Sequence, residues 1–306
     1  MGYINSEERK HNVTRRKIIF SAASLAVCAL LCLTLYYSDI AADAAKEGLI
    51  LASSAVVPAL FAFSVLARIL CEIGFPDFVI KTVPIHKLFG LPECTFPVIV
   101  CGFVGGFPVG AMLTADLYSR GRLTRGEAAR LCAISSNVSP AFLVGVVGKM
   151  FSSSEYGLKL WFVQSAVVIC AGAVMRYLPD DSSGKKENIN KKEHFSVIRT
   201  VCSAVAVSAA ACVTVTGYIV FFRVISAVVG AEVPRFYGVL RLVCEFSGGA
   251  EYAAELSSRA ACGFAVGFGG ISALMQVANY AEKEGIPMFA TVVVRVVCAG
   301  VLALVH

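Results

Sequence analysis

The stretch Cys101-Gly-Phe-Val-Gly-Gly-Phe-Pro-Val-Gly110 interrupts a long apolar run with glycines and a proline. A second interrupted stretch, Cys262-Gly-Phe-Ala-Val-Gly-Phe-Gly-Gly270, lies in the other half of the chain. Backbone that leaves a helix at bilayer depth exposes polar groups that lipid cannot satisfy, so it is tolerated only where protein covers it or where it lines a cavity. Broken hydrophobic segments in both halves of a chain are typical of transporter binding sites. The two stretches therefore predict a membrane protein with a binding site at the breaks.

The composition also indicates that the chain spans a bilayer. Of its 306 residues, 57% are hydrophobic and 16% are charged, and the mean hydropathy is +0.74. Soluble domains have about a quarter of their residues charged. An uncharged run of about 20 residues can cross the hydrocarbon core as a helix, so we predict an all-α integral membrane protein. Such runs cover residues 18–38, 48–67, 94–115, 200–222 and 260–281.

The net charge of +6 and the twelve cysteines do not indicate nucleic-acid or metal binding. The basic residues gather in loops, where they set the orientation of the chain in the membrane. The cysteines have no CxxC spacing, and in apolar runs they behave as small hydrophobic residues. HExxH, P-loop and GxSxG motifs are also missing from the sequence. We therefore expect no enzymatic activity, no cofactor, no metal and no nucleic-acid partner.

Basic residues concentrated before the first apolar run predict a cytoplasmic tail (1–17) and then a transmembrane helix (18–38). This helix is longer than the apolar region of a signal peptide and lacks a small-residue cleavage site, so we expect it to be retained. We expect an acidic outer loop over 39–47. The next helix, about 48–72, is expected to be kinked or to start at Pro58.

The rest of the chain divides into two halves with the same predicted order of elements. A Lys-rich cytoplasmic linker (179–195) joins the first half (48–178) to the second (196–306). Each half is expected to form a helix, a re-entrant hairpin, a broken helix and a final helix. Basic loops flank the first hairpin on both sides, which places both of its ends in the cytoplasm. With one hairpin opening inward and the other outward, the halves form an inverted repeat.

Two alignments of the halves are open. The pattern C-x-F-x-G-G pairs Cys101 with Cys244, whereas C-G-F-x-x-G-F pairs Cys101 with Cys262. We prefer the first because it keeps the order and orientation of the elements consistent. It places the hairpin apices at 105–106 and 248–249.

We expect the hairpin apices and helix breaks to meet near the bilayer midplane. Free amides at the N-termini of half-helices attract anions, and hydroxyl and amide side chains can complete a site there. The structural alternative is that the glycines only permit close helix packing and the serines only recap broken helices. The candidate substrate-binding residues are Gly105, Gly106, Ser136, Asn137, Ser139, Glu245, Ser247, Gly248, Gly269, Gly270, Ser272, Gln276 and Arg295.

Three charged residues require separate interpretations. Arg295 lies about 13 Å along the last predicted helix, and an ionisable group at that depth indicates a functional site. Glu245, at the second apex, is either a substrate contact or the ion-pair partner of Arg295 or Arg241. Asp116 ends the first hairpin, where Arg120 at i+4 is a suitable partner.

Several motifs together resemble one family. They are Gly102-Phe-Val-Gly-Gly-Phe-Pro-Val-Gly-Ala111, Asp116-Leu-Tyr, Gly126-Glu-Ala-Ala-Arg130, Asn137-Val-Ser-Pro140, Cys244-Glu-Phe-Ser-Gly-Gly249, Phe268-Gly-Gly-Ile-Ser272, Gln276 and Arg295. From about Pro58 to the C-terminus the chain resembles the YlbJ (SpoVV) family of sporulation integral membrane proteins. The second hairpin departs mildly from the family pattern, which has Glu-Val-Thr-x-Gly where this chain has Glu-Phe-Ser-Gly-Gly.

The resemblance implies a nucleoside-recognition (Gate) domain, similar to that of concentrative nucleoside transporters. It also implies a role in endospore formation, in the transport of dipicolinic acid across the outer forespore membrane. Dipicolinate is a rigid dianion, which suits opposed half-helix N-termini and one buried arginine. The nucleoside-recognition name does not by itself establish a nucleoside ligand.

Three functions are compatible with the sequence. The first is transport of a small organic anion, dipicolinate above all, by alternating access, with Arg295 neutralising a carboxylate. The second is cation-coupled transport of a nucleoside or another polar metabolite, with Glu245, Asn137 and Gln276 as the main contacts. The third is a non-transporting scaffold for envelope assembly. We expect a multi-pass protein of the cell membrane or the outer forespore membrane. Its expected partners are an anionic substrate and the lipid bilayer. An oligomeric assembly is compatible with each of the three functions.

Overall fold

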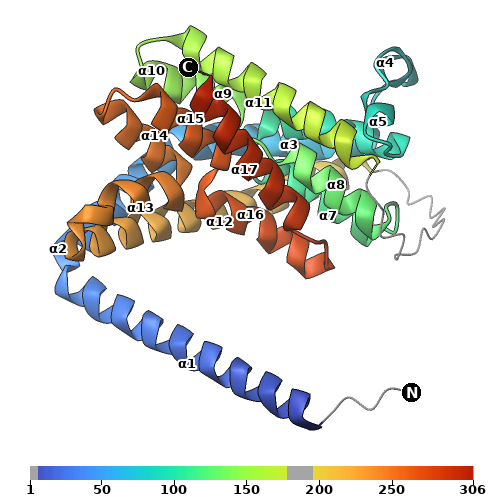
Figure 1. The fold of residues 1–306 in the computed structure, drawn as a ribbon. Coiled ribbons are helices and arrows are strands. Elements are labelled where there is room, and N and C mark those ends of the chain that lie inside the picture. Colours follow the sequence, from blue (N-terminus) through green and yellow to red (C-terminus); the bar gives the residue numbers. More distant parts are fainter. Residues whose placement is uncertain (1–5, 178–195, 306) are drawn as a thin grey trace.

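The computed structural model describes residues 6–177 and 196–305. All regular elements in these ranges are helices, which confirms the predicted all-α class. Within the described ranges, five helices are long and apolar enough to cross a bilayer, and a bent pair is a sixth candidate. The chain is therefore a multi-pass integral membrane protein. Figure 1 shows helices of both halves packed in one bundle, with α1 leaning away from it.

Helix α1 (Ser6–Tyr36) begins earlier than predicted, so residues 6–17 of the expected tail are helical. Its apolar part, Lys17–Tyr36, is long enough to cross the membrane, and none of it is buried in the protein. Exposed apolar side chains on this stretch, such as Phe20 and Leu25, suit contact with lipid. The predicted linker at 179–195 lies outside the described residues.

The prediction of an outer loop over residues 39–47 is wrong, because this stretch lies within helix α2 (Ser38–Leu51). Asp39 in the first turn interacts favourably with the positive end of the helix dipole, and alanine is the strongest helix former. Ala41, Ala44 and Gly48 are buried at helical spacing, and α2 packs against α12 (Val197–Glu232). The charges that suggested a loop lie on the exposed face of this helix.

A bend follows α2 at the predicted position. A π-helical turn, η1 (Ala52–Val56), leads into α3 (Val57–Ile73). The segments Ser38–Val56 and Leu60–Ile73 are inclined at 48°. Pro58 has no amide hydrogen to donate to the preceding turn, which gives the bend its cause. The predicted kink at this proline is confirmed.

The two halves contain hairpins, broken helices and final helices in the same order. The first half continues with α4 (Asp77–Thr82), α5 (Ile85–Leu88), η2 (Glu93–Thr95), the hairpin α6 (Phe96–Gly105) and α7 (Val109–Ser119), the broken helix α8 (Arg125–Ser135), α9 (Pro140–Phe142), η3 (Leu143–Val147) and α10 (Gly148–Met150), and α11 (Ser154–Met175). After α12, the second half has η4 (Pro234–Phe236), the hairpin α13 (Tyr237–Cys244) and α14 (Phe246–Glu255), the broken helix α15 (Arg259–Phe268) and α16 (Gly270–Ala281), η5 (Glu282–Glu284), and α17 (Phe289–Leu304).

This order fits the alignment of Cys101 with Cys244, because each lies on the first arm of a hairpin, whereas Cys262 lies on a broken helix. The first arms are short: α6 has 10 residues and α13 has 8. At 1.5 Å per residue they reach about 15 and 12 Å, roughly half of the ~30 Å hydrocarbon core. Such lengths suit re-entrant hairpins. The inversion of the two halves across the bilayer stays a prediction.

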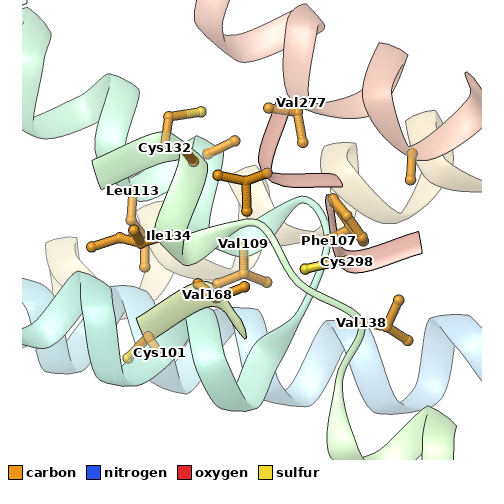
Figure 2. Packing of buried hydrophobic residues seen from close by; sticks show 14 of the residues in the cluster. Cys101, Phe107, Val109, Leu113, Cys132, Ile134, Val138, Val168, Val277 and Cys298 are labelled. Carbon is orange, nitrogen blue, oxygen red and sulfur yellow. The ribbon is translucent and has the colours of Figure 1, made fainter. Parts of the chain in front are cut away.

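The first hairpin packs closely against α8. Gly102 on α6 and Gly110 on α7 both face Ser135, and a Cβ atom on Gly110 would lie 2.1 Å from the Ser135 carbonyl oxygen. Figure 2 shows apolar residues of the hairpin and of α8, including Val109 and Ile134, gathered in the same core. This contact fixes the hairpin apex relative to the end of α8.

Helix α8 begins with the predicted capping box. The Glu127 amide donates to the Thr124 hydroxyl (3.2 Å), and the Thr124 amide donates to the Glu127 carboxylate (2.8 Å). This reciprocal pair satisfies two donors that the first turn of a helix cannot pair.

Candidate functional site

Four backbone breaks meet in the interior of the protein. The Phe107 amide at the first apex donates to the Asn137 carbonyl in the first broken helix (2.8 Å). The second break, at Gly269, approaches the Phe107 ring: a Cβ atom there would lie 3.2 Å from two ring carbons. The second hairpin turns at Glu245, between α13 and α14; the predicted apex at 248–249 is wrong, because the Glu245 carboxylate caps α14 and both glycines lie inside that helix. This apex contributes Phe246, whose ring centroid is 6.5 Å from that of Phe107. Both apices and both breaks are therefore neighbours, as predicted.

Glycine is required at two of these contacts. Gly106 has φ +76° and Gly270 has φ +75°, a region that residues with a side chain rarely adopt. A Cβ atom on Gly106 would lie 2.8 Å from the Ser139 nitrogen, and one on Gly270 would lie 3.0 Å from the Glu245 Cα atom. The backbone of each glycine thus approaches the backbone of a neighbouring break.

A cavity of about 90 Å³ lies at this meeting point. Four phenylalanine rings contribute to its wall, so the cavity is largely apolar. Polar groups come from the breaks themselves and from α16. Of the predicted site residues, the cavity is lined by Gly105, Gly106, Ser139, Ser247 and Gln276; its aromatic residues are Phe63, Phe107, Phe142 and Phe246.

Arg295 lies behind this cavity, with a relative exposure of 0%. Its guanidinium donates to Asn137 Oδ1 (2.9 Å), to Gln164 Oε1 (3.4 Å) and to Cys298 Sγ (3.3 Å). Its Cζ atom lies 5.7 Å from the centre of the Phe107 ring. Within the described part of the chain, Nε has no hydrogen-bond partner and no carboxylate reaches ion-pair distance. All of its contacts are therefore with neutral groups.

Sequence reasoning missed Gln164, which organises the first break. Its Nε2 donates to the Val138 carbonyl (3.0 Å), and its Oε1 accepts from the Val138 amide (3.3 Å) and from Arg295. Gln164 lies in the uncharged run 160–175 of helix α11, where a glutamine needs a partner, and this was the available signal. Phe107 and Cys298 gave no comparable signal, because both residue types are common in apolar segments.

Glu245 caps a helix and has no ion pair with Arg295 or Arg241 in the described residues. Its carboxylate accepts from the amides of Ser247 (3.0 Å) and Gly248 (2.8 Å), and also from the Ser247 hydroxyl. These amides begin α14, whose first turn has no internal acceptors for them. The ion-pair alternative from the sequence is wrong, because the nearest donors are those of its own helix.

We expect Glu245→Ala to lower the stability of the ligand-free protein by about 1–2 kcal/mol, the usual cost of losing an N-cap. Glu245→Gln keeps an oxygen acceptor and is the matched control, with a smaller loss expected. Thermal unfolding in detergent measures both. A Glu245→Ala protein as stable as wild type but defective in ligand binding would contradict the capping role.

The other predicted site residues lie around the cavity without lining it. The Ser136 hydroxyl is 4.0 Å from Cys132 Sγ, and the Ser272 hydroxyl accepts from Gln276 Nε2 (3.3 Å). The prediction that Arg120 pairs with Asp116 is confirmed at 3.0 Å, away from the site.

A second, larger cavity of about 1010 Å³ is lined by residues that are chain neighbours of those lining the first, such as Ser54 beside Ala55. Its wall includes Arg223 on α12, one turn after Ile219, which lines the small cavity. Arg223 forms ion pairs with Glu47 (3.4 Å) and with Glu251 on α14. The predicted residues Glu245 and Gly248 face this larger cavity. Four glutamates and two arginines line this larger cavity beside the second hairpin.

In the described ranges, no group of three or more His, Cys, Asp or Glu side chains is arranged to hold a metal ion. The fold and the site define a class: a multi-pass α-helical membrane protein in which the broken segments of two similarly ordered halves meet beside a buried arginine.

The chain is similar to the sporulation integral membrane protein YlbJ of Bacillus subtilis (strain 168). The two are 30% identical over 148 residues, which cover 47% of this chain and 35% of that protein. The chain thus matches about a third of the length of its relative. This similarity confirms the family resemblance predicted from the motifs. No protein-family model matches the chain. No solved structure matches it.

Proposed function

We propose that the protein transports a small organic anion across a membrane, and that the anion is dipicolinate during endospore formation. One observation carries the proposal: Arg295 is fully buried and is contacted by neutral groups alone among the described residues. A buried charge without a counter-ion costs several kcal/mol of desolvation. A carboxylate ligand would provide that counter-ion.

The surroundings of Arg295 support an aromatic anion. Phenylalanine rings line the adjacent cavity, and aromatic ligands pack favourably against such rings. Dipicolinate combines a planar ring with two carboxylates, so one molecule could use both the apolar wall and the guanidinium.

The alternative of a nucleoside ligand has less support. Of its three proposed contacts, Glu245 caps α14 and Asn137 accepts from Arg295, so both already have internal partners. Gln276 alone lines the small cavity. In our proposal the protein carries out transport and catalyses no chemical reaction. It lies in the outer forespore membrane, with its N-terminus in the cytoplasm. A coupling cation and an oligomeric assembly are compatible with it.

The test is thermal unfolding of the purified protein in detergent with pyridine-2,6-dicarboxylate or with a panel of nucleosides. We expect the dicarboxylate to stabilise the protein, by about 2.7 kcal/mol at a concentration of 100 Kd, and the nucleosides to have no effect. Uptake of the labelled dicarboxylate into proteoliposomes then tests transport. Stabilisation by nucleosides alone would refute the anion assignment.

The scaffold alternative predicts a different result. A non-transporting scaffold would show neither ligand stabilisation nor uptake, and would tolerate changes at the breaks. Gly106→Leu separates the two functions, because its side chain would press on Ser139 at the meeting point of the breaks. Retained function in Gly106→Leu would support the scaffold.

A further inference from the structure

We propose that Phe107 is a movable wall between the cavity and Arg295, and that its ring determines which anions reach the guanidinium. This inference rests on the proposed function, because it requires an anion to bind Arg295. It adds a residue that selects among anions.

Phe107 separates two parts of the site. Its ring lines the cavity of about 90 Å³. Beyond the ring, at 5.7 Å from its centre, lies the Cζ atom of Arg295, which does not line the cavity. The ring face attracts the guanidinium through a cation–π interaction. In the ligand-free protein the uncharged ring therefore lies where a counter-ion of Arg295 would otherwise be.

The rest of this wall is held by hydrogen bonds. Val138 also lines the cavity, and both its amide and its carbonyl are bonded to Gln164 (3.3 and 3.0 Å). The Phe107 amide is bonded to Asn137 (2.8 Å), but its ring, which packs against Phe246 and faces Arg295, makes no hydrogen bond in the described structure. The ring can therefore rotate away without breaking a hydrogen bond, whereas the Val138 backbone cannot move in this way.

The size of the cavity shows when the ring has to move. An apolar cavity of about 150 Å³ binds benzene, whereas this one has about 90 Å³. An aromatic carboxylate therefore enters only if a wall group is displaced. An entering aromatic ring can take over the contact that Phe107 makes with Phe246, at a centroid distance of 6.5 Å. Acetate is too small to replace that contact, so Phe107 disfavours its access to Arg295.

Phe142 provides a matched control. Its ring lines the same cavity and packs against Phe246 with a centroid distance of 5.0 Å, but it has no cation–π contact with Arg295 in the described structure. Truncating either ring enlarges the cavity. Of the two truncations, only that of Phe107 also uncovers the guanidinium of Arg295.

The experiment compares wild type, Phe107→Ala and Phe142→Ala by calorimetric titration with benzoate and with acetate in detergent. In wild type we expect benzoate to bind more tightly than acetate. In Phe107→Ala we expect acetate to bind about tenfold more tightly than in wild type, since the cation–π contact no longer competes with it. The preference for benzoate should fall accordingly. Phe142→Ala should keep the wild-type preference.

An unchanged preference in Phe107→Ala, or an equal change in both variants, would overturn the role of Phe107 while leaving anion binding intact. If neither anion binds to wild type or to any variant, the proposed function fails and this inference fails with it. Should Phe107→Ala not fold, Phe107→Leu tests the same ratio, because leucine fills the space without presenting a ring face.

Discussion

Replacing Arg295 by glutamine should abolish anion binding and leave the ligand-free protein at least as stable as the wild type. The two effects have opposite signs because the guanidinium has no counter-ion among the described residues. Its charge is a cost in the empty site and an anchor in the occupied one. Most substitutions of buried polar groups reduce stability, so this combination is diagnostic.

The expected changes in ligand affinity and in stability both follow from the burial of Arg295. Removing one partner of a buried charged pair costs about 2–5 kcal/mol of binding, which corresponds to a loss in affinity of roughly thirtyfold or more. Replacing buried charges by neutral groups of similar volume is often neutral, or stabilising by about 1–4 kcal/mol. Glutamine is shorter than arginine and leaves some space, so the gain lies at the lower end of that range.

Thermal unfolding in detergent, with and without pyridine-2,6-dicarboxylate, measures both effects in one experiment. Arg223→Gln is the contrast for stability, because Arg223 has carboxylate partners in Glu47 and Glu251. We expect that variant to be less stable than the wild type. A marked loss of stability in ligand-free Arg295→Gln would show that the guanidinium is a structural element and would contradict its role as an unpaired anchor.

Gly110→Ala should destabilise the protein by about 3 kcal/mol or more, at the upper end for overpacked sites. The added Cβ atom would lie 2.1 Å from the Ser135 carbonyl oxygen and 2.6 Å from its carbonyl carbon. Because the obstacle is backbone, a rotamer change cannot relieve the clash, so α7 has to move away from α8. Ser135 is followed by the break that carries Asn137, so the Arg295 site should be displaced as well.

Gly217→Ala is the matched control for this change. Gly217 also lies within a helix, α12, but a Cβ atom there would meet nothing within 4 Å. Helix propensity then favours alanine by roughly 1 kcal/mol, so we expect this variant to be as stable as wild type or more so. Unfolding temperatures and ligand binding of the two variants provide the comparison. Equal stability of the two proteins would mean that α7 and α8 are not in close contact.

Local chemistry accounts for the parts of the fold that were predicted correctly. Thr124 and Glu127 form the expected capping box, and Pro58 lies at the expected bend, because caps and prolines act on the backbone within a few residues. The breaks at Gly106 and Gly269 follow for the same reason. The failures came where a local pattern has two outcomes: the charges of residues 39–47 suit a loop and also the exposed face of α2.

The sequence by itself determined that this chain spans a membrane, where three of its four breaks lie, and that a charge lies deep in α17. Those properties depend on hydropathy and on the backbone conformations that residues close together in the chain favour. Only the tertiary structure decided what the charge contacts. Arg295 meets Asn137 and Gln164, which are 158 and 131 positions away in the chain, and Glu245 turns to the amides of its own helix. Partners at such separations are selected by the packing of whole helices, which no local pattern specifies.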